Sequence, residues 1–277
     1  EVDHFHHLGI NSNEKIVESF RDVKFVCMGG SARRALTFAK LLAREFGYDD
    51  REVLAYGDTE RYSLYKVGPV ISVSHGIGIP SLSILLNEMT KLLISAKAQN
   101  PVYIRMGTSG GIGVEPGTVV LTTESISPKL TPVFEQTVMG ETRYYPTLLT
   151  QNLNDEIYQL RNQLPVTMGK TFSTNSFYEE QMRSDGLFNP SFSNSEKLEF
   201  LHKLYEMGVR NIEMESLALS AFCLQAEIPV AVACVTLLDR LKGDQVLASK
   251  EELLDYSNRS HQLILSYIKS KIENGAM

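Results

Sequence analysis

Ile-Arg-Met-Gly-Thr-Ser-Gly-Gly, at residues 104–111, follows the apolar pair Val102-Tyr103 and leads from a strand-like run into glycine-rich backbone. Arg105 directly follows the apolar run, so its guanidinium is expected to be partly desolvated, and a buried guanidinium almost always has an anionic partner. The hydroxyl group and glycine N–H groups beside it are typical of backbone that holds an oxyanion. A tight turn with a structural ion pair is the alternative for this segment taken alone.

A second strand-to-glycine junction lies at residues 23–30, which read Val-Lys-Phe-Val-Cys-Met-Gly-Gly. From Arg34 to Ala43 the apolar residues recur at helical spacing, so these glycines are expected at a helix N-terminus, where N–H groups and the helix dipole favour anions. Neither junction matches a dinucleotide or nucleoside triphosphate motif. Two such junctions, each with an arginine, indicate a small divalent anion such as inorganic phosphate.

The composition is that of a globular protein, with 277 residues, 43% hydrophobic and 22% charged. We expect a single domain over residues 1–277, because no linker, repeat or low-complexity tract divides them. The net charge is −6 without a basic block, so nucleic acid is not an expected partner.

A membrane is not an expected partner either, since no apolar stretch approaches the roughly 20 residues of a spanning helix. The N-terminus lacks a signal-peptide pattern. The three cysteines lie in separate apolar runs, which indicates buried free thiols in a reducing compartment. The expected location is therefore cytoplasmic.

Strands and helices alternate along the chain. Strands are expected at residues 61–66 and 70–75, which form a hairpin, in the run that ends at Arg105, and at residues 117–123, 166–172 and 229–237. Helices are expected from Arg34, from Pro80, from the Ser193/Glu196 capping box to Gly208, and at residues 215–224 and 251–272. Continuous apolar strands separated by helices predict an α/β fold with a sheet covered on both sides.

A series of ordered motifs is similar to those of uridine phosphorylases, in the animal-type dimeric branch of the nucleoside phosphorylase family. The motifs occupy residues 26–31, 61–62, 65–69, 74–81, 105–113, 177–183 and 211–216. The resemblance implies a three-layer α/β/α fold with a central mixed sheet, nucleoside phosphorylase-like, and a site shared between two subunits. It also implies cleavage of a nucleoside by inorganic phosphate to give a base and ribose 1-phosphate.

The phosphate ligands that the resemblance implies are Gly30, Arg34, Arg105 and Thr108, with Arg61 supplied by the neighbouring subunit. Planar guanidinium forks pair bidentately with phosphate oxygens and can orient a dianion for attack. A solvated surface arginine is the alternative for Arg61. Arg33 is expected to face solvent, and the choice of Arg34 rests on the resemblance.

The ribose ligands implied are Glu213, Met214 and Glu215, with His7 reaching the 5′-hydroxyl across the subunit interface. Carboxylates accept hydrogen bonds from vicinal hydroxyl groups, and Glu215 is the principal 2′/3′-hydroxyl ligand expected. Two first-turn carboxylates that complement a helix dipole are the alternative for the glutamates, and core packing is the alternative for Met214.

The base-binding residues implied are Phe177, Gln181, Arg183, Leu237, Leu238 and Arg240. A glutamine amide offers a donor and an acceptor that match an edge of uracil, and donors aimed at the departing ring stabilise its negative charge. The catalytic residues are therefore expected to be Arg105, Gln181 and Arg183. A surface loop is the alternative for residues 181–183. Asp239 stands where an asparagine is expected in this family.

The expected reaction is reversible phosphorolysis of uridine to uracil and ribose 1-phosphate, in pyrimidine salvage, by direct attack of bound phosphate on C1′. We expect no cofactor, with phosphate as co-substrate, and no metal site, because His4, His6 and His7 lack acidic or cysteine ligands at useful spacing. A catalytically silent nucleoside-binding paralogue and a hydrolytic nucleosidase on the same scaffold are the alternatives. Purine phosphorolysis is less expected.

Overall fold

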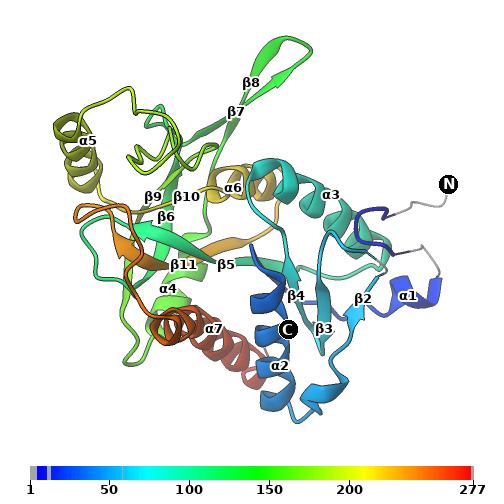
Figure 1. Ribbon diagram of the computed structural model, residues 1–277. Coiled ribbons are helices and arrows are strands. Elements are labelled where there is room, and N and C mark those ends of the chain that lie inside the picture. Colours follow the sequence, from blue (N-terminus) through cyan, green and yellow to red (C-terminus); the bar gives the residue numbers. More distant parts are fainter. Residues whose placement is uncertain (1–4, 11–13, 58, 276–277) are drawn as a thin grey trace.

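A mixed sheet of nine strands forms the middle of the protein (Figure 1), in a computed structural model that describes residues 5–10, 14–57 and 59–275. The strand order is β10-β9-β6-β11-β5-β1-β4-β3-β2. In chain order, these strands are β1 (Phe25–Gly29), β2 (Ala55–Tyr56), β3 (Leu64–Val67), β4 (Val70–Ser74), β5 (Val102–Gly111), β6 (Val119–Ile126), β9 (Val166–Ser173), β10 (Val209–Glu213) and β11 (Val230–Asp239).

Helices cover both faces of this sheet because successive strand residues point to opposite sides. In β1, Phe25 and Cys27 pack with α2 (Ala32–Glu45), α4 (Gln151–Gln159) and α7 (Lys250–Glu273), whereas Val26 and Met28 pack with α3 (Ile79–Ser95) and α6 (Ser216–Gln225). A third cluster lies under α5 (Asn194–Glu206). The short elements are α1 (Glu14–Glu18) and η1 (Asp50–Glu52), a 3-10 helix. The predicted three-layer α/β/α arrangement is confirmed.

Strand β5 is longer than the sequence predicted. It does not end at Arg105 but continues to Gly111, parallel to β11 throughout and antiparallel to β10 at Gly110 and Gly111. The tight turn that was the alternative for residues 107–111 was therefore wrong, since this backbone belongs to the sheet. The glycines allow close packing instead: a Cβ atom at Gly111 would lie 3.0 Å from the carbonyl oxygen of Leu238.

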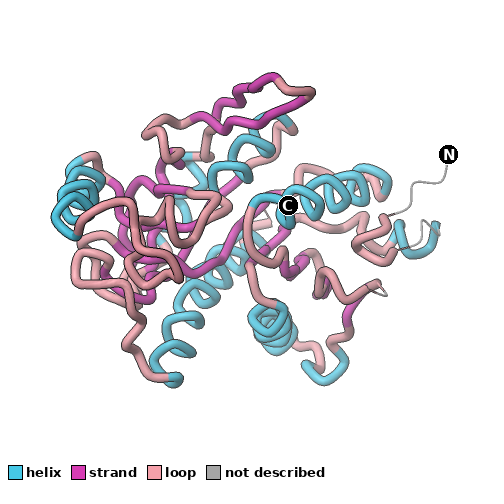
Figure 2. The backbone as a smooth tube through the Cα atoms, turned by 45° about the horizontal axis from the view of Figure 1, so that its top comes forward, coloured by secondary structure: helices cyan, strands magenta, loops and turns pink. Residues whose placement is uncertain are grey.

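Most predicted elements are present. The β3–β4 hairpin is antiparallel, Pro80 lies in the first turn of α3, and Ser193 and Glu196 form the capping box of α5. Two elements were missed in the polar middle of the chain: α4, and the hairpin of β7 (Val133–Val138) and β8 (Glu141–Pro146), which projects from the body (Figures 1 and 2). The single domain over residues 1–277 stays a prediction.

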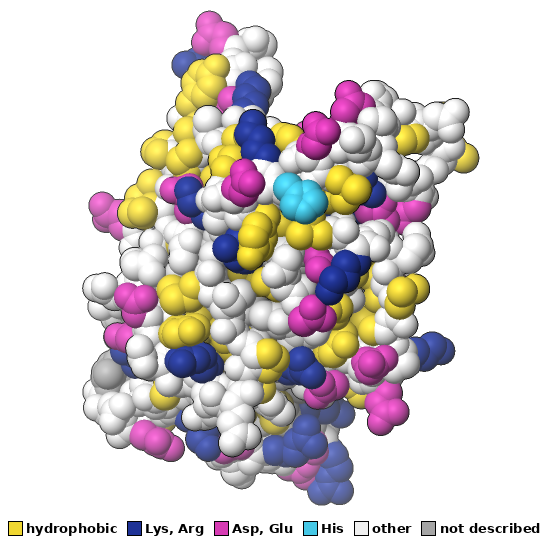
Figure 3. Space-filling view, turned by 90° about the vertical axis from the view of Figure 1, so that its left-hand side faces the viewer, with side chains coloured by type: hydrophobic (Ala, Val, Ile, Leu, Met, Phe, Trp, Pro, Cys, Tyr) yellow, Lys and Arg dark blue, Asp and Glu magenta, His cyan; other side chains and the backbone are white. Residues whose placement is uncertain are grey.

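The surface mixes charges of both signs. On the face that carries α5, acidic, basic and apolar side chains are interspersed (Figure 3). The three cysteines are buried free thiols, as predicted. None of the helices in the described part of the chain is long and apolar enough to span a bilayer.

Candidate active site

A cavity of about 430 Å³ lies where the carboxyl ends of the parallel strands β1, β4, β5 and β11 meet, the usual position of a ligand site in an open α/β sheet. It brings together most of the site residues predicted from the sequence. Those that line it are Gly30, Arg34, Arg105, Thr108, Phe177, Gln181, Arg183, Glu213, Met214, Glu215, Leu237, Leu238 and Arg240.

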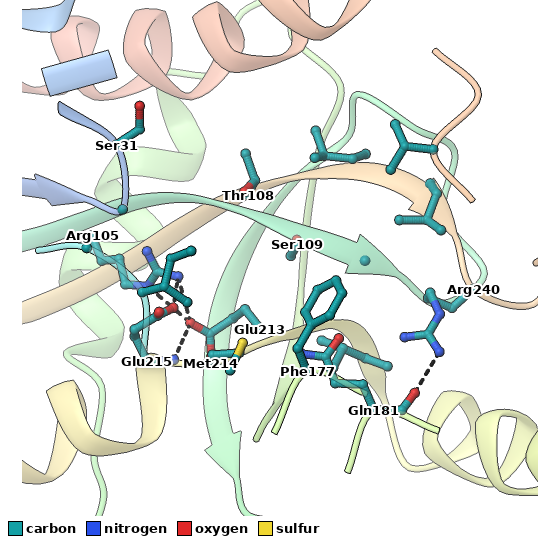
Figure 4. A pocket seen from close by; sticks show the side chains of 18 of the residues that line it. Ser31, Arg105, Thr108, Ser109, Phe177, Gln181, Glu213, Met214, Glu215 and Arg240 are labelled. Carbon is teal, nitrogen blue, oxygen red and sulfur yellow. Dashed lines mark hydrogen bonds and ion pairs between the residues drawn. The ribbon is translucent and has the colours of Figure 1, made fainter. Parts of the chain in front are cut away.

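Arg105 lies buried between two carboxylates at one end of the cavity (Figure 4). Its Nε donates to Glu213 Oε2 at 3.0 Å, and its Nη2 donates to Glu215 Oε2 at 2.5 Å. Its Nη1 lies 3.2 Å from His75 Nε2. The guanidinium is thus held by three side chains from different elements, and its orientation is fixed before any ligand arrives.

Arg34 lines the same end of the cavity from the first turn of α2, whose N-cap is Ser31. It forms no ion pair with a carboxylate among the described residues, and burial together with the positive charge of Arg105 lowers the pKa of its guanidinium. Two neighbouring cations in a partly desolvated site destabilise each other, and an anion bound between them removes this cost. Arg33, the preceding residue, is exposed as predicted.

Glu213 and Glu215 have different partners. The Glu213 carboxylate accepts from Arg105 Nε, from the backbone N–H groups of Glu215 and Ser216, and from the Ser216 hydroxyl at 2.6 Å, so both oxygens are occupied and the group caps α6. Among the described residues, the Glu215 carboxylate accepts from Arg105 and from the N–H of Gly78, the latter at 2.6 Å, and from no other group at hydrogen-bond distance. Burial raises the pKa of Glu215, against the effect of the Arg105 charge. Glu215 therefore keeps free lone pairs for a ligand.

The opposite end of the cavity is lined by Phe177, Gln181 and Arg240, with Met214 between the two ends (Figure 4). Gln181 is buried, and its Nε2 donates to Thr174 Oγ1 at 3.1 Å, which leaves its carbonyl oxygen and one N–H without a protein partner among the described residues. The Arg183 guanidinium stacks over the Phe177 ring at 4.4 Å from its centroid.

Asp244, which was not predicted from the sequence, binds three groups at this end of the cavity. Its carboxylate accepts from Arg240 Nε at 3.0 Å, from the Ser184 N–H at 2.9 Å and from the ammonium of Lys197. Arg240 also donates to the backbone carbonyl oxygen of Gln181 at 2.6 Å, which leaves the side-chain amide oxygen of Gln181 free of partners among the described residues. In the sequence, the spacing of four residues between Arg240 and Asp244 was the one local sign of this ion pair. Lys197 gives no such sign, because it lies 47 positions from Asp244.

Two predicted residues lie outside the cavity of this chain. Arg61 is exposed. His7 is half-buried, and its Nδ1 lies 2.6 Å from Glu88 Oε1. Both were expected to act in a neighbouring subunit's site, so a single chain does not test them. No cluster of three potential metal ligands occurs in the described part of the chain, and His4 lies outside that part.

Known proteins share both the sequence and the structure. Residues 24–269 match the Phosphorylase superfamily. The chain is 44% identical to uridine phosphorylase 1 of Mus musculus, over 91% of this chain and 83% of the relative. It superposes with a TM-score of 0.93 on uridine phosphorylase from Schistosoma mansoni in complex with uracil, at 39% identity over 98% of this chain and 95% of that chain.

The chain belongs to the phosphorylase superfamily. The family and the fold predicted from the sequence are thereby confirmed. Another relative, the inactive uridine phosphorylase B of Schistosoma mansoni, is 38% identical over 97% of this chain and 92% of the relative. Overall similarity within this family therefore does not separate an active enzyme from a silent one, and the side chains in the cavity must decide.

Asp239 does not face the cavity in this phosphorylase. Its Oδ1 accepts from the backbone N–H groups of Gly113 and Leu241, each at 3.1 Å, and its Oδ2 lies 3.4 Å from Lys242 Nζ. Asp239 lines a separate cavity next to α7. The carboxylate therefore organises the loop after β11 and is not available to protonate a base, as purine phosphorolysis would require.

Gly107→Ala is expected to reduce phosphorylase activity while preserving the fold. A Cβ atom there would lie 2.4 Å from Arg105 Nη1, so the guanidinium must move, and a shift near 1 Å costs about a hundredfold in kcat/KM. Steady-state kinetics measure kcat/KM, and a circular dichroism spectrum checks that the fold is preserved. Gly208→Ala is the control: Gly208 has φ of +88° with no atom within 4 Å, so its replacement lowers the melting temperature alone. Wild-type activity in Gly107→Ala would contradict the role of the Arg105 guanidinium in the active site.

Asp244→Asn is expected to destabilise the protein in a pH-dependent way. Although burial opposes ionisation, the hydrogen bonds from Lys197 and Ser184 and the charge of Arg240 hold the pKa of Asp244 well below its usual range. The ionised group therefore stabilises the folded state above its unfolded pKa, about 3.9, and this stabilisation is lost as the pH falls towards the lower folded pKa.

Urea unfolding at several pH values measures this effect. The difference between wild type and Asp244→Asn should be constant from about pH 8 to pH 5 and shrink below about pH 4. Asp255→Asn, an exposed carboxylate paired with Arg259 on α7, serves as the control and should change stability little. A difference that grows towards acid pH would show that Asp244 is not a stabilising anion.

Proposed function

We propose that the protein catalyses the reversible phosphorolysis of uridine, giving uracil and ribose 1-phosphate, and so acts as a pentosyltransferase in pyrimidine salvage. One observation supports this most: a single cavity has the cationic pair Arg34 and Arg105 with Glu215 at one end and the Gln181 amide at the other, with Met214 between the ends. The cationic pair suits phosphate, the Glu215 carboxylate suits the ribose hydroxyl groups, and the amide suits the nucleobase.

Phosphate is proposed to bind at Gly30, Arg34, Arg105 and Thr108 and to attack C1′ of the ribose directly. A bond forms between a phosphate oxygen and C1′, while the C1′–N1 bond breaks with its electron pair leaving on N1 of uracil. The proton of HPO₄²⁻ passes to the uracil anion, so the products are neutral uracil and the ribose 1-phosphate dianion. Holding two reactants in line for attack can lower the barrier by roughly 7–11 kcal/mol in favourable geometry. No side-chain nucleophile and no cofactor is required.

Ribose is proposed to be held by Glu215 and Met214, with Glu213 acting through its bonds to Arg105 and α6. At the base end, Gln181 and Arg183 donate to the uracil edge, and these bonds strengthen as negative charge develops on the ring. Phe177, Leu237, Leu238 and Arg240 enclose the base. The buried thiols fit a reducing compartment, and we propose a cytoplasmic location on that ground.

A silent paralogue is the second candidate, because one relative bears the word inactive in its name. The intact set Arg34, Arg105, Gln181 and Glu215, all lining one cavity, favours activity. Uracil release from uridine, followed by absorbance, separates these candidates. A hydrolytic nucleosidase does not need the cationic pair, and it would release uracil equally well without phosphate.

Arg34→Ala and Arg33→Ala form a matched pair that tests the proposed function. The Arg34→Ala variant loses charge-assisted hydrogen bonds to phosphate, so its KM for phosphate should rise by about tenfold or more. Arg33 is exposed, so its replacement should leave both KM values within about twofold. Wild-type turnover that does not depend on phosphate, or an unchanged phosphate KM in Arg34→Ala, would overturn the proposal.

We further propose that the enzyme is a homodimer with shared sites, in which Arg61 and His7 of each chain complete the cavity of the other. Ile77 lines the mouth of the cavity and is 77% exposed, and Phe177 is 44% exposed. Such an apolar rim is typical of a surface covered by a partner. Arg61, exposed outside its own cavity, would add a further cation to the phosphate end.

Mixing Arg34→Ala with Arg61→Ala tests this arrangement. Each variant alone should be poorly active. In a mixed dimer one of the two sites receives both wild-type arginines, so co-refolding equal amounts should restore about a quarter of wild-type activity. Activity no higher than the mean of the two separate variants would show that Arg61 does not act across an interface.

A further inference from the structure

His75 belongs to the motif at residues 74–81, to which the sequence analysis assigned no role. It follows β4, is fully buried and lines the cavity. Its backbone N–H donates to the carbonyl oxygen of Gly29 at 2.8 Å, and the N–H of Gly78 donates to Glu215 at 2.6 Å. The segment is therefore anchored on both sides of the imidazole, which fixes the ring beside Arg105.

The hydrogen-bond partners of the ring determine its tautomer. Its Nε2 lies 3.2 Å from Arg105 Nη1, and a guanidinium can only donate, so Nε2 must accept. Burial and the positive charge of Arg105 lower the pKa of His75 well below its usual range, so the ring is neutral at physiological pH. The one ring proton is consequently on Nδ1.

This buried Nδ1–H meets no acceptor at hydrogen-bond geometry among the described residues, although the nearby backbone of Gly76 and of His75 itself partly opposes the lowering of the His75 pKa. An unpaired buried donor is costly, and such atoms in a native structure call for an acceptor from elsewhere. The molecule that enters this part of the cavity should therefore present an acceptor to His75.

Gly30 leaves the space in which that acceptor fits. A Cβ atom at Gly30 would lie 3.8 Å from His75 Cε1 and 3.9 Å from Arg34 Nη2. The absent side chain thus opens a space bounded by the imidazole edge and the guanidinium. The nearest acceptor is the carbonyl oxygen of Gly76, 2.9 Å from the same point, which matches the single hydroxyl group of HPO₄²⁻.

We propose that His75 is a further ligand of the phosphate co-substrate. Its Nδ1–H donates to a phosphate oxygen, while its Nε2 positions Arg105 on the same ion. The proposal rests on the phosphorolysis proposed above and adds a neutral donor to the arginines. A neutral donor holds a dianion without placing another positive charge next to Arg34 and Arg105, which already disfavour each other.

His75→Gln and His75→Asn separate the two ring nitrogens. The glutamine side chain reaches the Nε2 position and can still accept from Arg105, but it provides no donor at Nδ1. The asparagine side chain provides a donor near Nδ1 and no acceptor for Arg105. His75→Gln should raise the phosphate KM by about tenfold, with the uridine KM within about threefold. His75→Asn should keep a phosphate KM closer to that of the wild type.

The control is His202→Asn, an exposed histidine on α5 outside the cavity, which should leave both KM values within about twofold. An unchanged phosphate KM in His75→Gln, or equal rises in both KM values, would overturn the proposal. Calorimetric titration of inorganic phosphate into the protein without nucleoside gives a separate measurement of binding.

Calorimetry also distinguishes this proposal from the proposed function. Phosphate binding that is weakened about tenfold in His75→Gln would support the ligand assignment even if the wild type did not cleave uridine. Cleavage of uridine by the wild type, with equal phosphate affinity in wild type and His75→Gln, would leave the function standing and remove His75 from the site.

Discussion

Arg105 lies between Glu213 and Glu215 in a part of the protein from which water is nearly excluded. Burying any one of these three charges alone would destabilise the folded protein. The cluster is tolerated because each charge has an oppositely charged partner at hydrogen-bond distance. Glu213 transfers this constraint to α6 by capping its first turn. Glu215 transfers it to the segment after β4 through Gly78. Three elements that are distant in the sequence are thereby locked around one guanidinium.

The charges at the proposed phosphate end show what a cation from the proposed second subunit would add. Arg34 and Arg105 balance Glu213 and Glu215, so this end of the cavity has no net positive charge in a single chain, whereas Arg183 and Arg240 line the other end. In the proposed dimer, Arg61 of the second copy and the neutral His75 donor would each reduce the electrostatic cost of binding phosphate, and the raised pKa of Glu215 acts in the same direction. The end with Arg34 and Arg105 is thus nearly neutral when empty, and we propose that the second subunit completes it.

Strand β5 shapes both ends of the cavity. Gly107 leaves room for Arg105, and a Cβ atom at Gly110 would lie 3.0 Å from Arg240 Cγ. The sequence identified this stretch as decisive and predicted glycine-rich backbone that holds an oxyanion, with a tight turn as the alternative. As strand residues, these glycines allow arginine side chains to lie against the backbone. The arrangement depends on neighbours from other parts of the chain, such as Arg240.

Local patterns were sufficient where the physical cause is local. The capping box at Ser193, the helix opened by Pro80 and the apolar strand β11 were all predicted from residues a few positions apart. The resemblance added the site residues, and the cavity contains all of those expected from one chain. Asp244, with its partner Lys197, and the free Nδ1 of His75 could not be predicted, since their partners are brought together only by the fold.

Phosphorus NMR of the protein with uridine and inorganic phosphate is the decisive measurement, because it follows the phosphorus atom of the proposed co-substrate. Direct phosphorolysis predicts a new phosphomonoester resonance of ribose 1-phosphate that grows in step with the loss of inorganic phosphate and the release of uracil. Release of uracil with the inorganic phosphate signal unchanged would contradict it.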